Sequence, residues 1–278
     1  MKTILIPTDF SKNSWNALSY AVKIFKNISC NFYVLHVGDL ADSVVQNSPF
    51  NFHNKNLDIS IQEKFLKLFA KIEKITPNNG HQFIAVQEYG NMTNVIRNFV
   101  DDKKIDLIVM GTKGANGLKE TVLGSNTGDV ITKVPCNLMI IPENATFYLP
   151  EKIAFPTDYN IFYSHEILEA ITEILQITSA NFGVINIVNL KTKDNIVQQK
   201  NKSYLQEYLK ELFPTSHSFQ SLKNKNVKTA IEKFVKCEDI DMLVMVAKNL
   251  NFLQYLLFDT TIEKLSFHTT VPILVLHE

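Results

Sequence analysis

The chain repeats its own pattern, and this repeat constrains the fold more than any other feature of the sequence. The motif ILIPTD at residues 4–9 returns as IAFPTD at residues 153–158. The segment IRNFVDDKKIDLIVM from Ile96 matches IEKFVKCEDIDMLVM from Ile231, with seven of fifteen positions identical. We interpret this as an internal duplication whose halves meet near residues 143–152. Two shorter matches keep the same order in both halves: 31–34 with 181–184, and 134–135 with 271–272.

Short runs of β-branched and apolar residues alternate with segments of helical periodicity in each half. In the first helical segment, Trp15, Leu18, Val22 and Phe25 share one face, behind Ser11 or Asn13 as candidate caps. Strand–helix alternation predicts βαβ units with right-handed crossovers and a parallel sheet covered on both faces. We therefore predict an α/β fold of two tandem doubly wound, Rossmann-like domains, residues 1–146 and 147–278. The strands expected in the first half are 3–8, 31–37, 82–88, 105–110 and 137–141.

Composition and charge exclude several classes of protein. The chain has 28 basic and 28 acidic side chains, which argues against a nucleic-acid binder with a broad basic face and against a polybasic membrane anchor. No apolar run approaches the roughly 20 residues that a membrane helix needs. The three cysteines, Cys30, Cys136 and Cys237, are far apart and form no CxxC motif, so we expect reduced thiols and a cytoplasmic location. The histidines show no HxH or HExxH spacing, so no structural metal site is expected.

Glycine is scarce in this chain except in one stretch. It makes up 9 of 278 residues, about 3%, against a typical share of about 7%. Ligands of open parallel sheets bind beyond the carboxyl ends of the strands, and glycine lets the backbone approach a ligand closely. A glycine cluster directly after the expected strand 105–110 therefore predicts a binding site. The clustered residues are Gly111, Gly114, Gly117, Gly124 and Gly128.

The spacing of this cluster suits phosphate. It runs Gly111-x2-Gly114-x9-Gly124-Ser125, and Ser125 opens a short helical segment that extends to about Thr132. Backbone N–H groups and the positive end of the helix dipole would face an anion at that start, and the Ser125 and Thr127 hydroxyls add donors. The GxxxxGK[ST] motif, a GxGxxG after the first strand and the protein-kinase signatures are all missing from the sequence.

The order of these motifs resembles the universal stress protein family. The motifs on which this resemblance rests are PTD after the first strand, G-x2-G-x9-G-[ST] after the fourth strand, and a Val-Pro pair before the last strand. The resemblance covers nearly the whole chain as a tandem pair, and it implies an adenine nucleotide alpha hydrolase-like fold that binds an adenine nucleotide, usually ATP. Carried over by position, Thr8 and Asp9 would meet the adenosine part, and Val37 and Met110 would lie beside the base. The ribose and phosphates would be held by Gly111, Gly114, Gly124, Ser125, Asn126 and Thr127.

Plainer interpretations stay open for several of these residues. Asp9 is also a candidate cap for the following helix, because Asp158 stands in the matching place, and it is a candidate to help hold Mg²⁺. Gly111 and its neighbour at 114 can serve simply to shape a tight loop. Asn126 occupies a position that is often apolar in the family. His36 is interpreted as a satisfied core residue rather than a base, and the long segment 38–58 as a lid, a partner surface or filler.

The second half has lost the glycine motif. Valine at the first glycine position would block close approach of backbone to phosphate, and an aspartate at the third would repel it. The bulky apolar run FLQYLLF, residues 252–258, is expected to fill or cover the former pocket. We therefore predict a nucleotide site in the first domain only. The replacements are Gly111 by Val246, Gly114 by Asn249, and Gly124-Ser125 by Asp259-Thr260.

The last expected strand of each half, 137–141 and 273–277, is an apolar edge that needs cover. The resemblance implies that such strands pair around a two-fold axis between subunits. We expect the duplication to satisfy that pairing inside one chain, as an intramolecular pseudo-dimer, with a homodimer also open.

Catalysis is not favoured by the residues near the glycine motif. The only arginine in this half, Arg97, lies on the preceding helix, and no second carboxylate accompanies Asp9, so hydrolysis is expected to be slow or absent. The leading hypothesis is an ATP-binding stress-response or regulatory protein. The alternatives are a weak ATPase or nucleotidyl transferase, although the HIGH-type and SGGxDS-type signatures are missing, and a nucleotide-free interaction scaffold.

Overall fold

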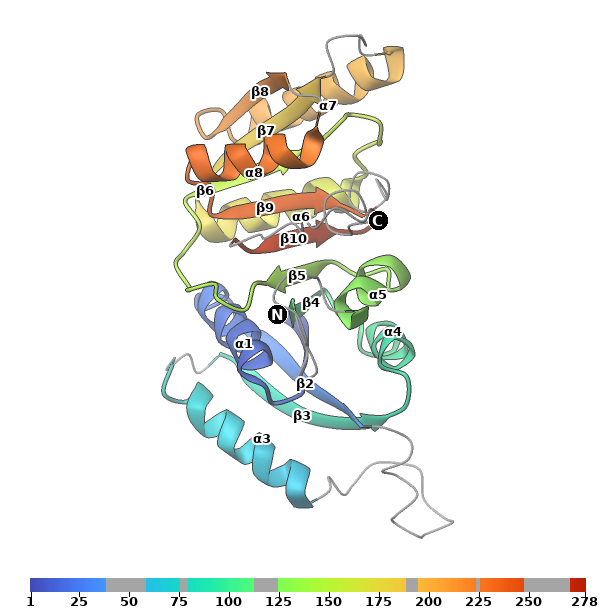
Figure 1. Ribbon diagram of the computed structural model, residues 1–278, viewed down its shortest axis with the longest axis vertical. Helices are drawn as coiled ribbons and strands as arrows, with labels where there is room; N and C mark the ends of the chain where they lie inside the picture. The colour runs from blue at the N-terminus through green and yellow to red at the C-terminus, as the bar shows by residue number, and fades with distance from the viewer. Residues whose placement is uncertain (39–58, 76–79, 113–124, 189–194, 224–225, 248–270) are drawn as a thin grey trace. The chain divides into compact units, whose positions relative to one another are not determined.

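The computed structural model of the 278-residue chain describes residues 1–38, 59–75, 80–112, 125–188, 195–223, 226–247 and 271–278 (Figure 1). The described residues form two compact units, the first ending at Glu143 and the second beginning at Asn144. Each unit contains a sheet of five strands, and the neighbouring strands within each sheet run parallel. The predicted α/β fold with parallel sheets is thereby confirmed.

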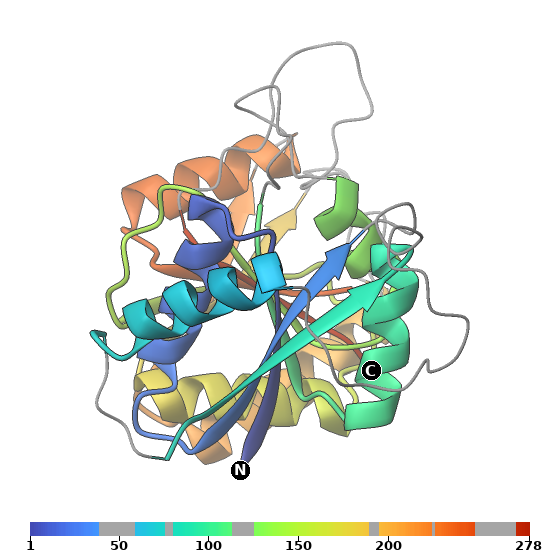
Figure 2. The same ribbon diagram turned by 90° about the horizontal axis from the view of Figure 1, so that it is seen from below.

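The first unit has the strand order β3-β2-β1-β4-β5. Helices α1 and α3 cover one face of this sheet, and α4 and α5 cover the other (Figure 1). The arrowheads of β2 and β3 point the same way in Figure 2, as parallel pairing requires. The strands are β1 (Lys2–Pro7), β2 (Cys30–Gly38), β3 (Gln82–Tyr89), β4 (Leu107–Gly111) and β5 (Leu138–Ile141). The helices are α1 (Lys12–Ile24), α3 (Ile59–Ile72), α4 (Met92–Lys103) and α5 (Ser125–Lys133).

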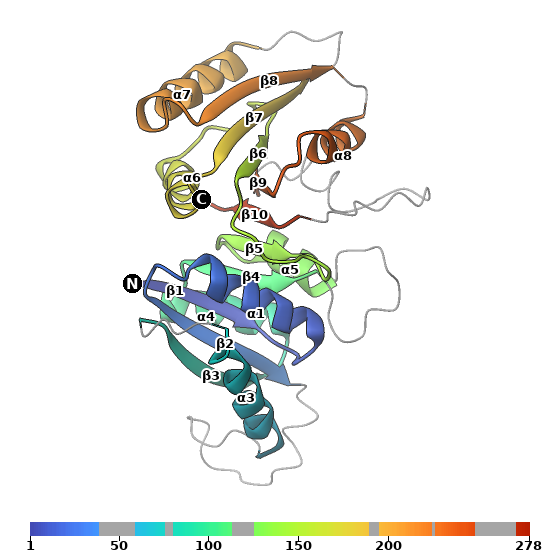
Figure 3. The ribbon, with the colours of Figure 1, turned by 90° about the vertical axis from the view of Figure 1, so that its left-hand side faces the viewer.

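The second unit repeats the arrangement, with the strand order β10-β9-β6-β7-β8. Figure 3 shows α6 and α7 on one face of its sheet and α8 on the other. The strands are β6 (Lys152–Pro156), β7 (Asn181–Val188), β8 (His217–Lys223), β9 (Met242–Val246) and β10 (Ile273–Leu276). The helices are α6 (His165–Thr178), α7 (Ile196–Leu212) and α8 (Val227–Cys237).

Strand β1 and helix α1 illustrate how the sequence builds each layer. Ile4, Leu5 and Ile6 are fully buried on both faces of the sheet, which explains why β1 is a continuous apolar run rather than an alternating one. Helix α1 begins after Ser11, whose hydroxyl accepts the Ser14 N–H at 3.2 Å, so Ser11 is the cap. Within the described part of the chain, no helix has the length and apolarity to cross a membrane.

The three cysteines differ in their access to solvent, which gives a prediction. Cys30 and Cys136 are buried, and Cys237 is exposed. Burial, together with the Asp106 carboxylate, raises the pKa of the Cys136 thiol to about 12, so that at pH 8 only about one such thiol in ten thousand is ionised. We expect a thiol-specific disulfide reagent at pH 8 to label one cysteine per folded chain and three after denaturation. Cys237→Ser should remove the fast-reacting thiol, and a second fast thiol in that variant would contradict the burial.

Candidate functional site

The predicted site residues of the first unit come together at one edge of its sheet. Strands β1, β2 and β4 are adjacent and parallel, so their carboxyl ends lie at the same edge. Thr8 follows β1 directly, Val37 lies near the end of β2, and Met110 and Gly111 end β4. This is the edge at which open parallel sheets bind their ligands. Two further predicted residues, Gly114 and Gly124, lie outside the described residues.

The turn after β1 is built by its own side chains. The Thr8 hydroxyl accepts the Phe10 N–H at 3.0 Å and donates to the Ser14 hydroxyl at 3.1 Å, and Thr8 is buried. A carboxylate oxygen of Asp9 accepts the Ser11 N–H at 3.0 Å. Phe10 has a φ of 62°, in the left-handed region that a bulky residue rarely adopts, so the turn must hold it there. Asp9 therefore has a structural role in this turn, and its contact with a ligand stays a prediction.

His36 braces the same turn from β2. Its Nδ1 lies 2.8 Å from the Thr8 carbonyl oxygen, which can only accept, so Nδ1 is the donor. Its ring lies 4.9 Å from the ring of Phe10, centroid to centroid. Phe10 also meets Phe65 of α3 edge-on, with ring centroids 5.1 Å apart, and the Lys64 ammonium lies 5.6 Å from the centroid of the Phe10 ring. The hydrogen bond agrees with a satisfied histidine, but no sequence pattern indicates that its partner is the PTD turn.

Gly111 is required by the packing of α1. A Cβ at this position would lie 2.5 Å from the Asn13 Oδ1 and 2.6 Å from the Asn13 Cγ, distances that real Cβ atoms do not show. Asn13 is 95% buried in the first turn of α1, since its exposed fraction is only 5%. Packing within the unit thus explains why glycine stands at this position. Sequence reasoning treated Asn13 only as a candidate cap, because nothing in the local pattern links it to a residue almost one hundred positions away.

Helix α5 brings the remaining predicted residues to this edge. Thr127 is 3% exposed, and its hydroxyl donates to the Gly111 carbonyl at 2.9 Å, so this proton is already committed inside the unit. Ser125 and Asn126 are exposed at the start of the helix, and its first turn carries no acidic residue. Asp129, further along, is paired with Lys133 at 2.8 Å. The start of α5 therefore offers N–H groups and neutral polar side chains, which suit an anion.

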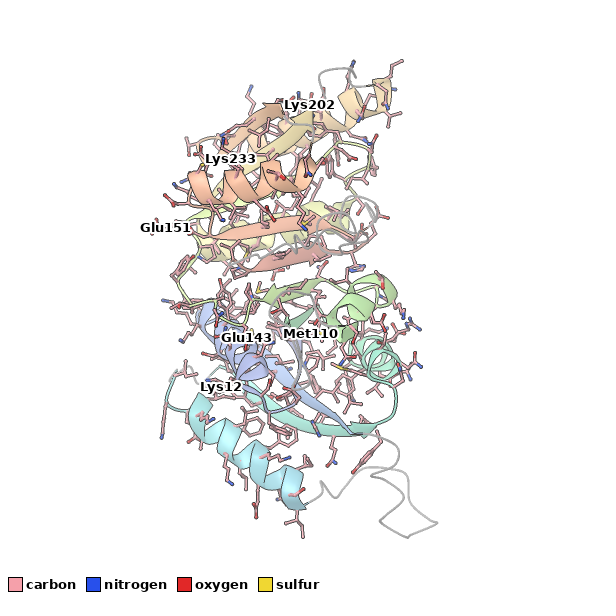
Figure 4. All side chains as sticks on the ribbon, in the orientation of Figure 1. Lys12, Met110, Glu143, Glu151, Lys202 and Lys233 are labelled. Carbon is pink, nitrogen blue, oxygen red and sulfur yellow. The ribbon has the colours of Figure 1, made fainter. Side chains whose placement is uncertain are left out.

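The apolar residues predicted to lie beside a base differ in exposure. Val37 is partly exposed at the carboxyl edge. Met110 is 5% exposed and lies on β4 among the densely packed side chains of the first unit (Figure 4). Met110 thus contributes mainly to the core of the unit. Contact of either residue with a base stays a prediction.

The guanidinium of the chain's single arginine lies at the end of α5 that is opposite to Ser125. The guanidinium of Arg97, on α4, donates two hydrogen bonds of 3.0 and 2.6 Å to the Lys133 carbonyl. Lys133 is the last residue of α5, so Arg97 caps the end opposite to Ser125, about 12 Å along the helix axis. Among the described residues, no group of three His, Cys, Asp or Glu side chains is placed to hold a metal ion.

The second unit contains the same turn, closed by other side chains. Thr157 again accepts the N–H two residues ahead, at 3.1 Å, and Tyr159 has a φ of 58°. Asp158 accepts the Asn160 N–H at 3.0 Å, like Asp9 in the first unit. Its second carboxylate oxygen accepts the Asn160 side-chain amide at 2.8 Å. Both oxygens of this aspartate are therefore engaged within the turn itself.

A buried tyrosine occupies the place that Ser14 holds in the first unit. The Tyr163 hydroxyl lies 2.8 Å from the Thr157 hydroxyl, and Tyr163 is fully buried. Burial raises the pKa of its phenol, which stays neutral. Helix α6 begins at His165, four residues later than the position that matches the start of α1. The second unit thus replaces about one helical turn by an aromatic side chain packed on the PTD turn.

Residues of helix α7 and strand β9 also distinguish this edge of the second unit from the matching edge of the first. Side-chain amides of Gln198 and Asn201 donate to the Asp158 and Tyr159 carbonyls at 2.8 and 2.9 Å. Val246 pairs with the end of β10 in the register in which Gly111 pairs with the end of β5, so the two positions are structurally equivalent. The other predicted replacements, Asn249, Asp259, Thr260 and residues 252–258, lie outside the described residues, as does the segment 39–58 of the first unit.

Comparison with known proteins places this geometry in context. The model of the universal stress protein family matches residues 1–142. Universal stress protein MJ0531 of Methanocaldococcus jannaschii is 31% identical over 140 residues, which cover 50% of this chain and 81% of that protein. Universal stress protein YxiE of Bacillus subtilis is 28% identical over 146 residues, covering 50% and 97%. Among solved structures, a universal stress protein from Archaeoglobus fulgidus has the same fold over 99% of this chain and 98% of its own, with a TM-score of 0.70 and 16% identity.

Proposed function

The chain belongs to the universal stress protein family as a tandem two-domain member, and from this premise we propose that its first domain binds an adenine nucleotide, preferably ATP. One observation carries the proposal. The PTD turn, the end of β4 and the uncharged start of α5 share one sheet edge in the first unit. That edge combines apolar side chains with donors and a helix N-terminus, the chemistry that a nucleotide needs for its base and its phosphates.

The residues divide between the two ends of such a ligand. Thr8 and Asp9 would meet adenosine, with Val37 and Met110 beside the base. The phosphates would lie at the start of α5, where exposed Ser125 and Asn126 and the helix N–H groups can donate. The motif glycines Gly111, Gly114 and Gly124 would let the backbone approach the ribose and phosphates, and Thr127 would fix Gly111. The phosphates of a bound nucleotide would carry the negative charge that attracts Mg²⁺, and Asp9 is the candidate residue to help hold that ion.

The second domain, residues 147–278, is proposed to bind no nucleotide. Three observations support this. Both carboxylate oxygens of Asp158 are engaged by Asn160, the Tyr163 ring packs where the first unit has a serine, and Val246 replaces the first glycine of the motif.

We propose a regulatory, nucleotide-sensing role rather than catalysis. Transfer of a phosphoryl group needs charge stabilisation beside the transferred group, and the one arginine of the chain caps the far end of α5. A weak ATPase or nucleotidyl transferase is the second candidate, and steady phosphate release that Asp9→Ala abolishes would favour it. A nucleotide-free scaffold is the third.

Substitution of the two matching aspartates tests the proposal with a built-in control. Asp9 and Asp158 each accept the N–H two residues ahead at 3.0 Å, so replacing either by alanine removes this backbone hydrogen bond from its turn, and Asp158→Ala also removes the bond from the Asn160 side chain. In the full chain, we expect Asp9→Ala to weaken ATP binding by roughly ten- to a hundredfold, as loss of a charged hydrogen bond does. Asp158→Ala should leave the affinity unchanged. Isothermal titration calorimetry measures both, and equal affinities for the two variants would contradict a site confined to the first domain.

We propose that the apolar last strands of the two domains pair within one chain as a pseudo-dimer, with a homodimer as the alternative, because such edges need cover.

We also infer a cytoplasmic location from three scattered cysteines that form no CxxC motif.

A further inference from the structure

The peptide that joins Gly111 to Thr112 is held at both of its polar groups. Its carbonyl oxygen accepts the Thr127 hydroxyl at 2.9 Å, and its N–H donates to the Ile141 carbonyl at 3.2 Å. The Asn13 side chain packs against the Cα of Gly111 so closely that a Cβ would lie 2.5 Å away. Because α1 and α5 cover opposite faces of the sheet, Asn13 and Thr127 reach Gly111 from two sides (Figure 1).

The second unit shows the same strand end without this arrangement. Val246 stands in the register of Gly111, and the residue in the place of Asn13 is Phe162, which is 62% exposed. Val246 carries the side-chain atoms for which Gly111 leaves no room, and α6 begins only at His165, after Phe162. The two positions therefore differ together between the two copies of one fold.

We infer that Asn13 and Thr127 are positioning residues of the nucleotide site, which fix the Gly111 peptide at the sheet edge where the phosphates would lie. This inference rests on the proposed function. The hydrogen bond from Thr127 also has an electrostatic consequence. A carbonyl oxygen left without a donor at this edge would repel phosphate oxygens, and the Thr127 hydroxyl offsets its partial charge. Neither residue needs to touch the ligand for this effect.

A positioning role and a purely structural role predict different effects on the binding of ATP and of adenosine. If the two residues only stabilised the fold, their loss would change the binding of ATP and adenosine alike. Since Gly111 begins the predicted phosphate motif while the PTD turn is held separately by Ser14 and His36, the effect should fall on ATP. The ratio of the dissociation constants of ATP and adenosine therefore reports on the inference directly.

The test uses a matched pair of variants in the full chain. Thr127→Val keeps the shape of the side chain and removes the donor, whereas Thr127→Ser keeps the hydroxyl. By calorimetric titration, we expect Thr127→Val to weaken ATP binding by roughly ten- to a hundredfold, the range for losing a residue that holds a ligand-contacting group in place, and to change adenosine binding by less than about twofold. Thr127→Ser should stay within about threefold of the wild type for both ligands. Asn13→Ala should resemble Thr127→Val, and it supplies the comparison should the valine variant not fold.

The outcomes separate this inference from the proposed function. An unchanged ratio of the two dissociation constants in Thr127→Val and Asn13→Ala, with the wild-type chain binding ATP, would overturn the positioning role alone. If Thr127→Ser, which keeps the hydroxyl, bound ATP as weakly as Thr127→Val, that result would also overturn the positioning role. Failure of the wild-type chain to bind ATP would overturn both proposals together.

Discussion

Replacing Gly111 by alanine is expected to lower the free energy of unfolding of the first unit by about 1–3 kcal/mol, the usual penalty for forcing an extra carbon into a filled site. The new Cβ would lie 2.5–2.6 Å from three atoms of the Asn13 side chain, and Asn13 is buried in the first turn of α1. The Asn13 side chain, the helix start or the end of β4 must therefore shift. Urea unfolding of the full chain, followed by circular dichroism, measures the loss.

Two controls make this result specific. Gly183 is also a strand glycine, and a Cβ there would meet its nearest atoms, the Ser218 Oγ and the Ile153 carbonyl, at 3.7 and 3.9 Å. Gly183→Ala should therefore be neutral or stabilise by up to about 1 kcal/mol. Adding Asn13→Ala to Gly111→Ala should restore at least about 1 kcal/mol relative to the sum of the single changes, because the clashing atoms are gone. A loss in Gly111→Ala no larger than in Gly183→Ala would contradict the packing described.

Tyr163→Ala is expected to destabilise the second unit by about 3–5 kcal/mol, the range for removing a large buried aromatic ring. The side chain is fully buried, its ring lies 6.0 Å from that of Phe155, and its hydroxyl contacts Thr157 at 2.8 Å. Loss of the ring leaves a cavity beneath the turn and removes one of the two hydrogen-bond partners of the Thr157 hydroxyl, the other being the Tyr159 N–H. ATP binding by the first domain should persist at temperatures where the variant remains folded.

Calorimetric melting curves of three variants check this second prediction. Tyr163→Phe removes only the hydroxyl, so it should cost about 1 kcal/mol. Tyr204→Ala removes a ring that is 41% exposed and stacked on the exposed Phe162, so it should cost much less than Tyr163→Ala. If Tyr163→Ala and Tyr204→Ala destabilised the chain equally, Tyr163 would not be the packed core of this turn.

The fold could be predicted from the sequence because its signals are local and repeated. Strand 31–37 was expected from its apolar run and is β2, Cys30–Gly38, while 105–110 corresponds to β4, Leu107–Gly111. Once the strands are parallel, their carboxyl ends must share an edge, so Thr8, Val37 and Gly111 could be placed together without coordinates. The duplication then carried the same pattern to the second half.

The partners within the site could not be predicted in the same way. The bond from Thr127 to Gly111 and the contact of Asn13 with Gly111 join segments that no periodicity connects. Tyr163 is a further case, because the helical pattern marks the body of α6 but not the four residues by which its start is delayed. The sequence also indicates two reasons for Gly111, close approach to a ligand and the shaping of a tight loop, and the structure adds a third, the packing of α1.

The central claim is that one nucleotide binds, and that it binds in the first domain. The most direct measurement is photolabelling of the full chain with an azido-adenine analogue of ATP, followed by peptide mass spectrometry. We expect saturable labelling that unmodified ATP competes away, at one nucleotide per chain, with every labelled peptide inside residues 1–142, the span that matches the family. Comparable labelling of peptides from residues 147–278, or labelling that ATP does not displace, would contradict the claim.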